Sequence, residues 1–293
     1  MVGPRRALII RNPVAGRGRA ERAWPDIVQR LKGFDFEAVV SSRSGEAIVL
    51  AENAKHPVVI AYGGDGTVHE VVNGLMRAGA KATLGVIPVG SGDDFAKMLG
   101  PGDAIERILA GKTKAVDIGA VRAENQTRFF ANCMDIGFGA HGARNIASVP
   151  RFLTGLGAYL AALVLTLVRY PRLEVRAQID EGRPFGLTTV MAAAMNGTTF
   201  GGSFRVCPEA CIDDGFLDLL LVDALGRLEI LGLVPKIMRG THVGDPRLRL
   251  LRARKLTIES EAPLLVEADG EIPFAAARRI EVELLPGALR VLA

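Results

Sequence analysis

The sequence predicts an α/β fold in which a domain built on a parallel sheet is followed by a mainly β domain. Through the first third of the 293 residues, short apolar runs alternate with segments of helical periodicity, which is the pattern of βαβ units. After about residue 115, alternating polar and apolar residues become dominant, as in antiparallel strands. This change predicts two domains, residues 1–122 and residues 123–293.

The first domain repeats one pattern of strand and helix. Its first predicted helix places apolar residues three and four positions apart, as one buried face requires. These residues are Ala20, Ala23, Trp24, Ile27, Val28 and Leu31. The predicted strands are residues 7–10, 36–40, 58–62 and 84–88, and the further helices are residues 46–54, 68–76 and 103–110.

The second domain opens with a predicted hairpin, because apolar runs at residues 115–123 and 128–138 flank the polar turn at residues 124–126. Alternating polarity predicts further strands, at residues 173–179, 187–195, 216–222, 248–260 and 280–285. Helices are expected to interrupt them at residues 152–170 and 228–239.

The most apolar stretch, residues 152–168, has a borderline length for crossing a bilayer. Arginines flank it on both sides and no second span is visible, so we expect a helix that is buried or faces a membrane. The N-terminus lacks the apolar core and cleavage site of a secretory signal, and three cysteines without a framework spacing indicate reduced thiols. A cytoplasmic protein is therefore expected.

The charge pattern limits the classes of molecule that the protein is expected to bind. The net charge is +4, and the basic residues are spread along the chain without a Lys/Arg block. Nucleic acid is therefore not expected as a partner, whereas an anionic lipid surface or a polyphosphate fits the charge.

A glycine-rich motif follows the predicted strand at residues 58–62. Residues 63–67 read Gly-Gly-Asp-Gly-Thr and lead into a helix, at the carboxyl end of a strand where open α/β sheets bind ligands. Glycines let a phosphate approach the backbone, and the helix N-terminus favours an anion. The alternative is a tight turn with a capping box between Thr67 and Glu70, which leaves Asp65 unexplained.

Two further glycine turns occur at equivalent strand ends, at residues 12–18 and 88–95. Each alone is compatible with an ordinary turn, and Ser91 with Asp94 is compatible with a helix cap. Glycine-rich turns after three strands of one sheet together predict a nucleotide cradle at a single sheet edge.

These motifs resemble the diacylglycerol kinase catalytic-domain superfamily, which includes bacterial soluble lipid kinases and sphingosine and ceramide kinases. The resemblance covers nearly the whole chain, although the Gly-Gly-Asp-Gly-Thr element is shared with NAD kinases and phosphofructokinase-like proteins. It implies a Rossmann-like first domain, a β-sandwich second domain and a last strand that can return to the first. The matching segments are residues 12–16, 63–67 with Glu70 and Asn73, 90–95, 196–197, 201–202, 208–210, 213–218 and 269–271.

The resemblance implies an ATP- and Mg²⁺-dependent lipid kinase that transfers the γ-phosphate to a hydroxyl of diacylglycerol or a related lipid alcohol. Two departures concern the third glycine turn, where Ser91 replaces the common Thr and Asp93 replaces the common Asn. An extra carboxylate beside a triphosphate repels it unless a cation or an arginine compensates. Asp93, with the absence of a specific lipid head-group motif, keeps open a non-catalytic nucleotide- or lipid-binding protein. A soluble-substrate kinase of the NAD type stays a separate alternative.

The resemblance also implies the binding residues. Asp65 is expected to hold Mg²⁺ on the β and γ phosphates, and Arg17 and Arg19 are expected to add positive charge. A second metal site is implied at Asp214 and the carbonyls of Cys211 and Phe216, with a hairpin turn without an ion as the alternative. The implied nucleotide-binding residues are Asn12, Pro13, Val14, Ala15, Gly16, Ser41, Gly64, Asp65, Gly66, Thr67, Val68, His69, Glu70 and Ser91.

Phosphorylation of an alcohol needs a proton acceptor near the attacking hydroxyl. We predict Glu271 in this role, with Asp269 as its neighbour or as a member of the metal network, at an Asp-Gly-Glu bend for which a solvated hairpin turn is the alternative. In the sphingosine kinase branch the residue matching Asp65 has this role, so Asp65 stays a candidate. A lipid substrate further implies transient contact with an anionic membrane and an acyl slot along residues 152–170, and a homodimer is compatible with the sequence.

Overall fold

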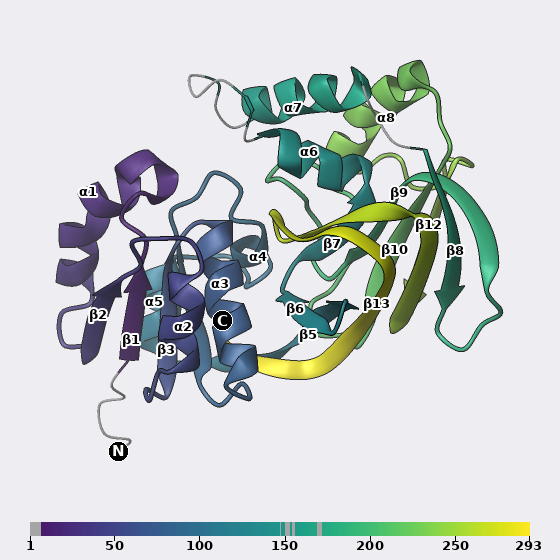
Figure 1. Cartoon of the computed structure of the whole chain (residues 1–293). Coiled ribbons are helices and arrows are strands. Elements are labelled where there is room, and N and C mark those ends of the chain that lie inside the picture. The colour runs from purple at the N-terminus through teal and green to yellow at the C-terminus, as the bar shows by residue number, and fades with distance from the viewer. Residues whose placement is uncertain (1–6, 147, 150–152, 154–155, 169–171) are drawn as a thin grey trace. The chain divides into compact units, whose positions relative to one another are not determined.

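Two units divide the chain in this computed structural model, which describes residues 7–146, 148–149, 153, 156–168 and 172–293 (Figure 1). The first unit comprises the residues up to Asp117 together with Gly287–Ala293, and the second comprises Ile118–Pro286. The predicted boundary at residue 122 lies close to the observed division, and the last residues return to the first unit. The predicted α/β fold with a β-rich second part is confirmed.

A parallel sheet forms the first unit. Its strands lie in the order β2, β1, β3 and β4, and the end of β13 continues the sheet where Val291 pairs with Leu84. The predicted strands and longer helices are confirmed, with small shifts at their ends. The elements are β1 (Ala7–Arg11), α1 (Ala15–Arg30), β2 (Phe36–Val40), α2 (Glu46–Glu52), β3 (Val58–Gly63), α3 (Asp65–Arg77), β4 (Thr83–Pro88), α4 (Asp94–Lys97) and α5 (Ala104–Ala110).

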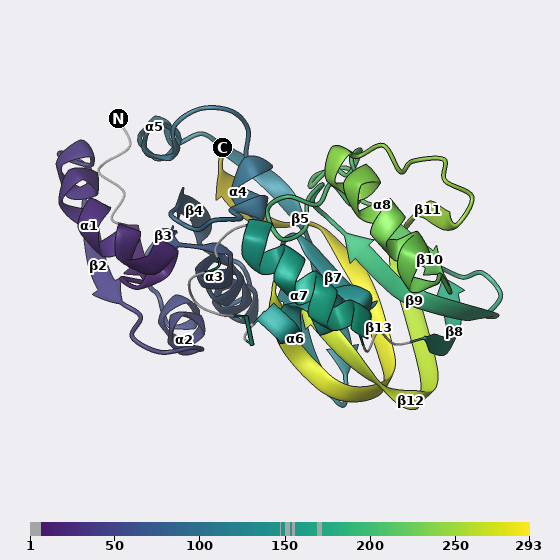
Figure 2. The same ribbon diagram turned by 90° about the horizontal axis from the view of Figure 1, so that it is seen from above.

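Helices cover both faces of this sheet. Residues of α1 and α5 share one core cluster with β1 and β3, in which Ile9, Ile60 and Tyr62 are fully buried. Figure 2 shows α2 and α3 on the other side. The strand order reverses at β1, which lies between β2 and β3, and open α/β sheets bind ligands beside the carboxyl ends of strands at such a point.

Helix α1 differs from its prediction in two ways. Residues 16–18 have non-helical backbone angles with positive φ, so the helix is interrupted near its start. Val28 is 39% exposed, so its assignment to the buried face is wrong. The buried stripe contains Ala20 and Ile27, and successive residues of a helix are rotated by about 100°, which turns Val28 towards solvent.

The second unit is built mainly from antiparallel strands. β12 pairs with β8 through Leu256–Glu259 and with β7 through Val266–Ala268, and β9 also pairs with both. The folded sheet encloses an apolar core that includes Met134, Leu219 and Phe274. The strands are β5 (Thr113–Ala123), β6 (Gln126–Phe130), β7 (Cys133–Gly137), β8 (Leu173–Ile179), β9 (Phe185–Met195), β10 (Leu217–Asp223), β11 (Leu248–Ala253), β12 (Lys255–Ala268) and β13 (Glu271–Leu292).

Two predicted strands of the second unit are wrong in part. The segment 128–138 contains a break between β6 and β7, and Phe138 already begins helix α6 (Phe138–Ile146), because Gly137 turns the chain with φ of 92°. The segment 248–260 is divided at Arg254, whose amide donates to Asp180 Oδ1 at 2.8 Å instead of continuing the strand.

Two longer helices pack against β9 and β10. Helix α7 (Leu156–Val168) lies within the predicted helix 152–170, of which residues 152, 154–155 and 169–170 fall outside the described residues. Helix α8 (Arg227–Arg239) matches its prediction. Leu167 and Leu233 of these helices share a core cluster with Leu220. Within the described part of the chain, no helix is long and apolar enough to cross a membrane.

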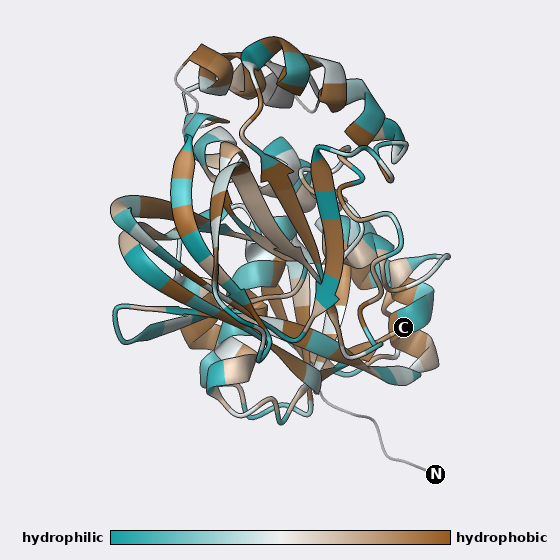
Figure 3. Cartoon of the chain, turned by 90° about the vertical axis from the view of Figure 1, so that its right-hand side faces the viewer, coloured by the Kyte–Doolittle hydropathy of each residue, from teal (hydrophilic) through white to brown (hydrophobic). Residues whose placement is uncertain are grey.

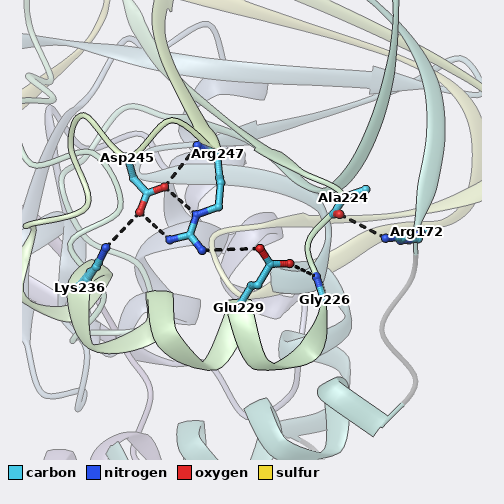
Figure 4. Close-up of polar contacts among 7 residues, drawn as sticks. All are labelled: Arg172, Ala224, Gly226, Glu229, Lys236, Asp245 and Arg247. Atoms are coloured by element: carbon cyan, nitrogen blue, oxygen red, sulfur yellow. Dashed lines mark hydrogen bonds and ion pairs between the residues drawn. The ribbon is translucent and has the colours of Figure 1, made fainter.

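A polar network fixes one side of α8 (Figure 4). Asp245 accepts from Lys236 Nζ at 3.2 Å and from Arg247 Nε at 2.8 Å, and the Arg247 guanidinium holds the pKa of the Asp245 carboxyl well below its usual range. Glu229 Oε2 accepts from the Gly226 amide at 2.8 Å, at the start of the helix. These contacts orient α8 with Leu228 and Leu231 exposed to solvent.

Candidate functional site

The glycine turns of the first unit lie at one edge of the sheet. They follow β1, β3 and β4, which are adjacent and parallel, and the strand ends align because Arg11 pairs with Tyr62 and Gly63 pairs with Pro88. The expected common edge is therefore confirmed. We refer to residues 12–18, 63–67 and 88–95 as the first, second and third turns.

Side chains join the first turn to the other two. Asn12 Nδ2 donates to Thr67 Oγ1 at 3.2 Å, and Arg19 Nη2 donates to the carbonyl of Gly90 at 2.7 Å and to that of Val89 at 3.1 Å. Gly16 has φ of 57°, and a Cβ there would lie 2.3 Å from the Val89 oxygen. Only glycine allows this approach without a backbone shift.

The second and third turns are in direct backbone contact. A Cβ on Gly90 would lie 2.9 Å from the Cα of Gly64, and a Cβ on Gly64 would lie 3.2 Å from the Cα of Gly90. The amide of Val89 also donates to the carbonyl of Gly63 at 2.8 Å. The three turns therefore form one continuous backbone surface.

Asp65 connects the second turn to the third through both carboxylate oxygens. Oδ2 accepts from the amide of Asp93 and Oδ1 from the amide of Asp94, each at 2.8 Å. The pKa of Asp65 is raised to about 6, first by burial and then by the charge of Asp94, although the two amide hydrogen bonds oppose the shift. Asp65 thus has a protonation equilibrium close to neutral pH within the glycine surface.

Asp93, the departure from the family pattern, has a structural contact of its own. Its φ is 52°, and its Oδ1 accepts from the amide of Gly90 at 2.9 Å. Burial raises the pKa of Asp93, whereas the charges of Lys97 and Arg19 lower it. The positive charge that the extra carboxylate requires is therefore present beside it.

Neither of the helix caps considered as alternatives is present. Glu70 accepts from the amides of Gly45 at 2.8 Å and Ala47 at 3.0 Å, so it caps α2 instead of forming a box with Thr67, whose hydroxyl is bonded to Asn12. Helix α4 follows Asp93 without a side-chain cap, because the Asp65 carboxylate already accepts from its first amides. Thr67, Val68 and His69 are buried, and so is the predicted nucleotide contact Ser41, whereas Val14 and Ser91 are exposed.

The Asp-Gly-Glu bend of the second unit is a two-residue hairpin turn. Asp269 and Gly270 connect β12 to β13 with φ of 49° and 92°, as a type I′ turn requires. Asp269 Oδ2 accepts from the Ala131 amide at 2.8 Å, and Oδ1 accepts from the amides of Asn132 and Cys133 at 3.0 Å. The Asp269 carboxylate therefore fastens the break between β6 and β7, whereas the Glu271 side chain is exposed at the start of β13.

At the predicted second metal site, an arginine side chain forms an ion pair with the carboxylate. Asp214 pairs with the guanidinium of Arg252, and its Oδ1 accepts from the amide of Phe216 at 3.1 Å. Arg252 and Arg254 both lie over the Phe216 ring, at 4.6 and 5.0 Å from its centroid. Arg252 therefore offsets the charge of Asp214 here, and magnesium at Asp214 and the carbonyls of Cys211 and Phe216 stays a prediction.

Sequence reasoning missed three groups in the second unit. Arg252 gave no signal, because this residue of β11 contacts Asp214 in the turn before β10, which is distant along the chain. Asp135 and Glu267 are buried acids that each interrupt an apolar strand, and this isolated charge was the available signal.

Two family descriptions match the chain. The diacylglycerol kinase catalytic domain matches residues 6–121, and the YegS C-terminal NAD kinase beta sandwich-like domain matches residues 133–293. The chain belongs to the diacylglycerol kinase family. The resemblance inferred from its motifs is therefore confirmed, and membership of this family makes the protein a kinase, a phosphotransferase.

Individual members of the diacylglycerol kinase family support this assignment. A diacylglycerol kinase of Staphylococcus epidermidis is 30% identical over 276 residues, which is 91% of this chain and 86% of the relative. A Staphylococcus aureus diacylglycerol kinase has the same identity and coverage. A crystal structure from Bacillus anthracis str. Sterne, described there as a candidate diacylglycerol kinase, is 26% identical with a TM-score of 0.80 and covers 99% of this chain and 97% of its own.

The fold of this family extends to NAD kinases. A structure of an NAD kinase from Archaeoglobus fulgidus in complex with ATP has a TM-score of 0.54 at 12% identity, and it covers 98% of this chain and 93% of its own. This likeness shows the shared fold alone.

Proposed function

We propose that this kinase transfers the γ-phosphate of ATP, with Mg²⁺, to a hydroxyl of diacylglycerol or a related lipid alcohol. The observation that carries the proposal is the backbone surface of three glycine turns, held together by Asp65 at the carboxyl edge of the first sheet. The names of the staphylococcal relatives support a lipid as the acceptor.

The glycine surface suits a polyphosphate. Its backbones approach closely at Gly64 and Gly90, where no Cβ separates the second turn from the third. Helix α3 begins at Asp65, so the second turn lies at the N-terminus of this helix, where the positive end of the helix dipole favours an anion. Arg19 adds a guanidinium beside the third turn, where it contacts two carbonyl oxygens.

Magnesium fits this site as an ion held mainly by phosphate oxygens. Asp65, Asp93 and Asp94 gather at the third turn, where Lys97 and Arg19 offset part of their negative charge, and a bound cation would offset the rest beside a triphosphate. Among the residues that the structure describes, no group of three or more acidic, histidine or cysteine side chains is placed to hold a metal by itself. Mg²⁺ would neutralise charge on the transferred phosphate, with Asp65 as the protein carboxylate that holds it directly or through water.

Glu271 is the proposed proton acceptor. It is exposed at the start of β13, next to a turn whose conformation is fixed by the contacts of Asp269. Asp269 is less suited to accept a proton, because its oxygens already receive three amide hydrogen bonds. Asp65 remains the other candidate, because its raised pKa suits proton exchange.

Helices α7 and α8 provide the proposed membrane contact. Their exposed apolar side chains are Val164, Leu165, Val168, Leu228 and Leu231, and Figure 3 shows apolar residues distributed along these helices. The guanidinium of Arg227 joins the two helices by donating to the Val168 carbonyl at 3.1 Å. Apolar side chains flanked by basic groups on a helix surface favour an anionic bilayer interface.

The membrane contact predicts a loss of vesicle binding. The double variant Leu228→Ser/Leu231→Ser should bind vesicles of phosphatidylglycerol and phosphatidylcholine about tenfold more weakly. Binding then loses the favourable free energy of moving two apolar side chains from water into the bilayer interface. Co-sedimentation measures the effect. Val49→Ser, which removes a 56% exposed apolar residue from α2, is the matched control and should bind normally. Equal binding by all three proteins would contradict the proposed contact.

The glycine surface predicts a graded loss of ATP affinity. Gly90→Ala should raise the KM for ATP by at least about tenfold, and Gly64→Ala by less, because the added Cβ lies closer to the opposite backbone at position 90. Gly186→Ala places a Cβ where nothing lies within 4 Å and should leave the KM unchanged. The same KM for all three variants would contradict a nucleotide site at these turns.

A labelled-ATP assay tests the function itself. Purified protein, Mg²⁺ and γ-labelled ATP are incubated with vesicles that contain a panel of diacylglycerols, ceramide, sphingosine or monoacylglycerol, and in parallel with NAD. We expect labelled phospholipid in the lipid arm, none after chelation of the metal, and renewed product when Mg²⁺ is restored. Product in the NAD arm alone indicates a soluble-substrate kinase. ATP binding without any product, while a known lipid kinase is active on the same panel, indicates a binding protein.

A further inference from the structure

Two acids are buried side by side in the second unit. Asp135 of β7 and Glu267 of β12 are paired in the sheet register, and they are 1% and 0% exposed. Buried carboxyl groups are expensive unless they are hydrogen-bonded or paired, and apolar residues of similar volume are often as stable or more stable. Stability alone therefore does not account for both acids at these positions.

Each acid accepts a backbone amide from a different element. Glu267 Oε1 accepts from Gly270, which lies in the turn between Asp269 and Glu271. Asp135 Oδ1 accepts from Ala140 at 2.7 Å, in the first turn of α6. The pair thus connects the amino end of α6 with the Asp-Gly-Glu turn.

Each acid has a second carboxyl oxygen that accepts no backbone amide of a described residue. No donor from the other described residues reaches Asp135 Oδ2 or Glu267 Oε2. Burial raises the pKa of Glu267 well above its usual range, and the charge of Asp135 adds to this effect. Burial also raises the pKa of Asp135, to about 6, although a hydrogen bond from Glu267 favours its charged form. One proton on Glu267, donated to Asp135, satisfies both oxygens.

We infer that the Asp135–Glu267 pair is a positioning device that fixes the turn bearing Glu271. Asp269 holds one side of this turn by accepting the amides of residues 131–133, and Glu267 holds the other by accepting the Gly270 amide. Gly270 is itself exposed, and a Cβ there would meet nothing within 4 Å, so side-chain packing does not restrain it. The inference rests on the proposed function for the role of Glu271 in turnover, whereas the restraint on Gly270 does not.

Three variants separate positioning from stability. Glu267→Gln keeps an oxygen for Gly270 and gains an amide donor for Asp135, so it preserves both contacts. Glu267→Leu removes them and leaves the Asp135 charge buried without its partner, which also destabilises the fold. Asp135→Asn/Glu267→Leu removes that buried charge while still lacking the acceptor for Gly270.

We expect Glu267→Gln to keep kcat within about threefold of the wild-type value, whereas both Leu variants lose about tenfold to a hundredfold in kcat with an unchanged KM for ATP. The thermal midpoint should fall most in Glu267→Leu and recover in the double variant. Exchange of the Gly270 amide with solvent, followed by NMR, should be slow in the wild type and Glu267→Gln and fast in both Leu variants.

Two results overturn the inference: a double variant with wild-type kcat and slow Gly270 exchange, or a Glu267→Gln variant as impaired as Glu267→Leu. The assay on diacylglycerol vesicles keeps this failure distinct from failure of the proposed function. If the wild type phosphorylates no lipid, the proposed function fails, and equal Gly270 exchange in all variants then decides against the restraint as well.

Discussion

Asp65→Asn should lower kcat/KM by about a hundredfold to a thousandfold, the largest effect expected of any single side chain in the first unit. Both oxygens of Asp65 accept backbone amides at 2.8 Å, from Asp93 and Asp94. An asparagine turns a donor towards one of these amides in either orientation of its side chain, so the third turn loses a contact and the site loses a charge. Steady-state kinetics with ATP and the best lipid of the panel measure the effect.

The matched control for this variant is Asp26→Asn, because Asp26 is an exposed acid on α1. It should retain wild-type kinetics. If Asp65→Asn also retained them, neither the link between the turns nor the candidate metal ligand would contribute to turnover.

The raised pKa of Asp65 predicts an acid limb in the rate profile. Above pH 6 the carboxylate is ionised and accepts both amides, whereas below this pH one oxygen becomes protonated and loses acceptor strength. Activity measured as kcat/KM should therefore fall as the pH decreases through about 6. The limb should be absent from the residual activity of Asp65→Asn, and an identical limb in that variant would assign it to another group.

Glu271→Gln should lower kcat by about a hundredfold to ten-thousandfold and leave the KM for ATP near its wild-type value. The amide is almost isosteric with the carboxylate but does not accept a proton at neutral pH. Because Glu271 is exposed, the thermal midpoint should not change, so the loss reports chemistry and not folding. Single-turnover measurements with labelled ATP separate the chemical step from product release.

Glu281→Gln is the control for this second variant. Glu281 is an exposed acid on the same strand that pairs with Arg279, and exposed ion pairs contribute little to stability. Its kcat should be unchanged. Wild-type turnover by Glu271→Gln would remove Glu271 as the proton acceptor and leave Asp65 as the candidate.

Local sequence patterns predicted most of the first unit correctly. Strand ends, helix periodicity and glycine turns are properties of neighbouring residues, so the sequence placed the three turns after β1, β3 and β4. Predictions that depended on distant residues were less successful. The alternative that paired Glu70 with Thr67, its neighbour in the helix, is not found, because Glu70 accepts from Gly45 and Ala47 across the helix pair formed by α2 and α3.

The second unit shows the same limit more strongly. Alternating polarity identified its strands but not their partners, and it joined β6 to β7 and β11 to β12. The pairing of Asp214 with Arg252 joins residues of separate strands and loops, so no spacing in the sequence indicates it.

The sequence by itself determined the family, the order of strands and helices, and the glycine turns that suit a phosphate, because these depend on residue type and on contacts within a few positions. Tertiary structure alone decided what each acidic side chain does. Asp65 and Asp269 hold backbone amides, Asp214 is neutralised by Arg252, and Asp135 meets Glu267 in the core. A carboxylate acquires its charge state and its partners from the groups that folding brings around it, and those groups lie far away along the chain.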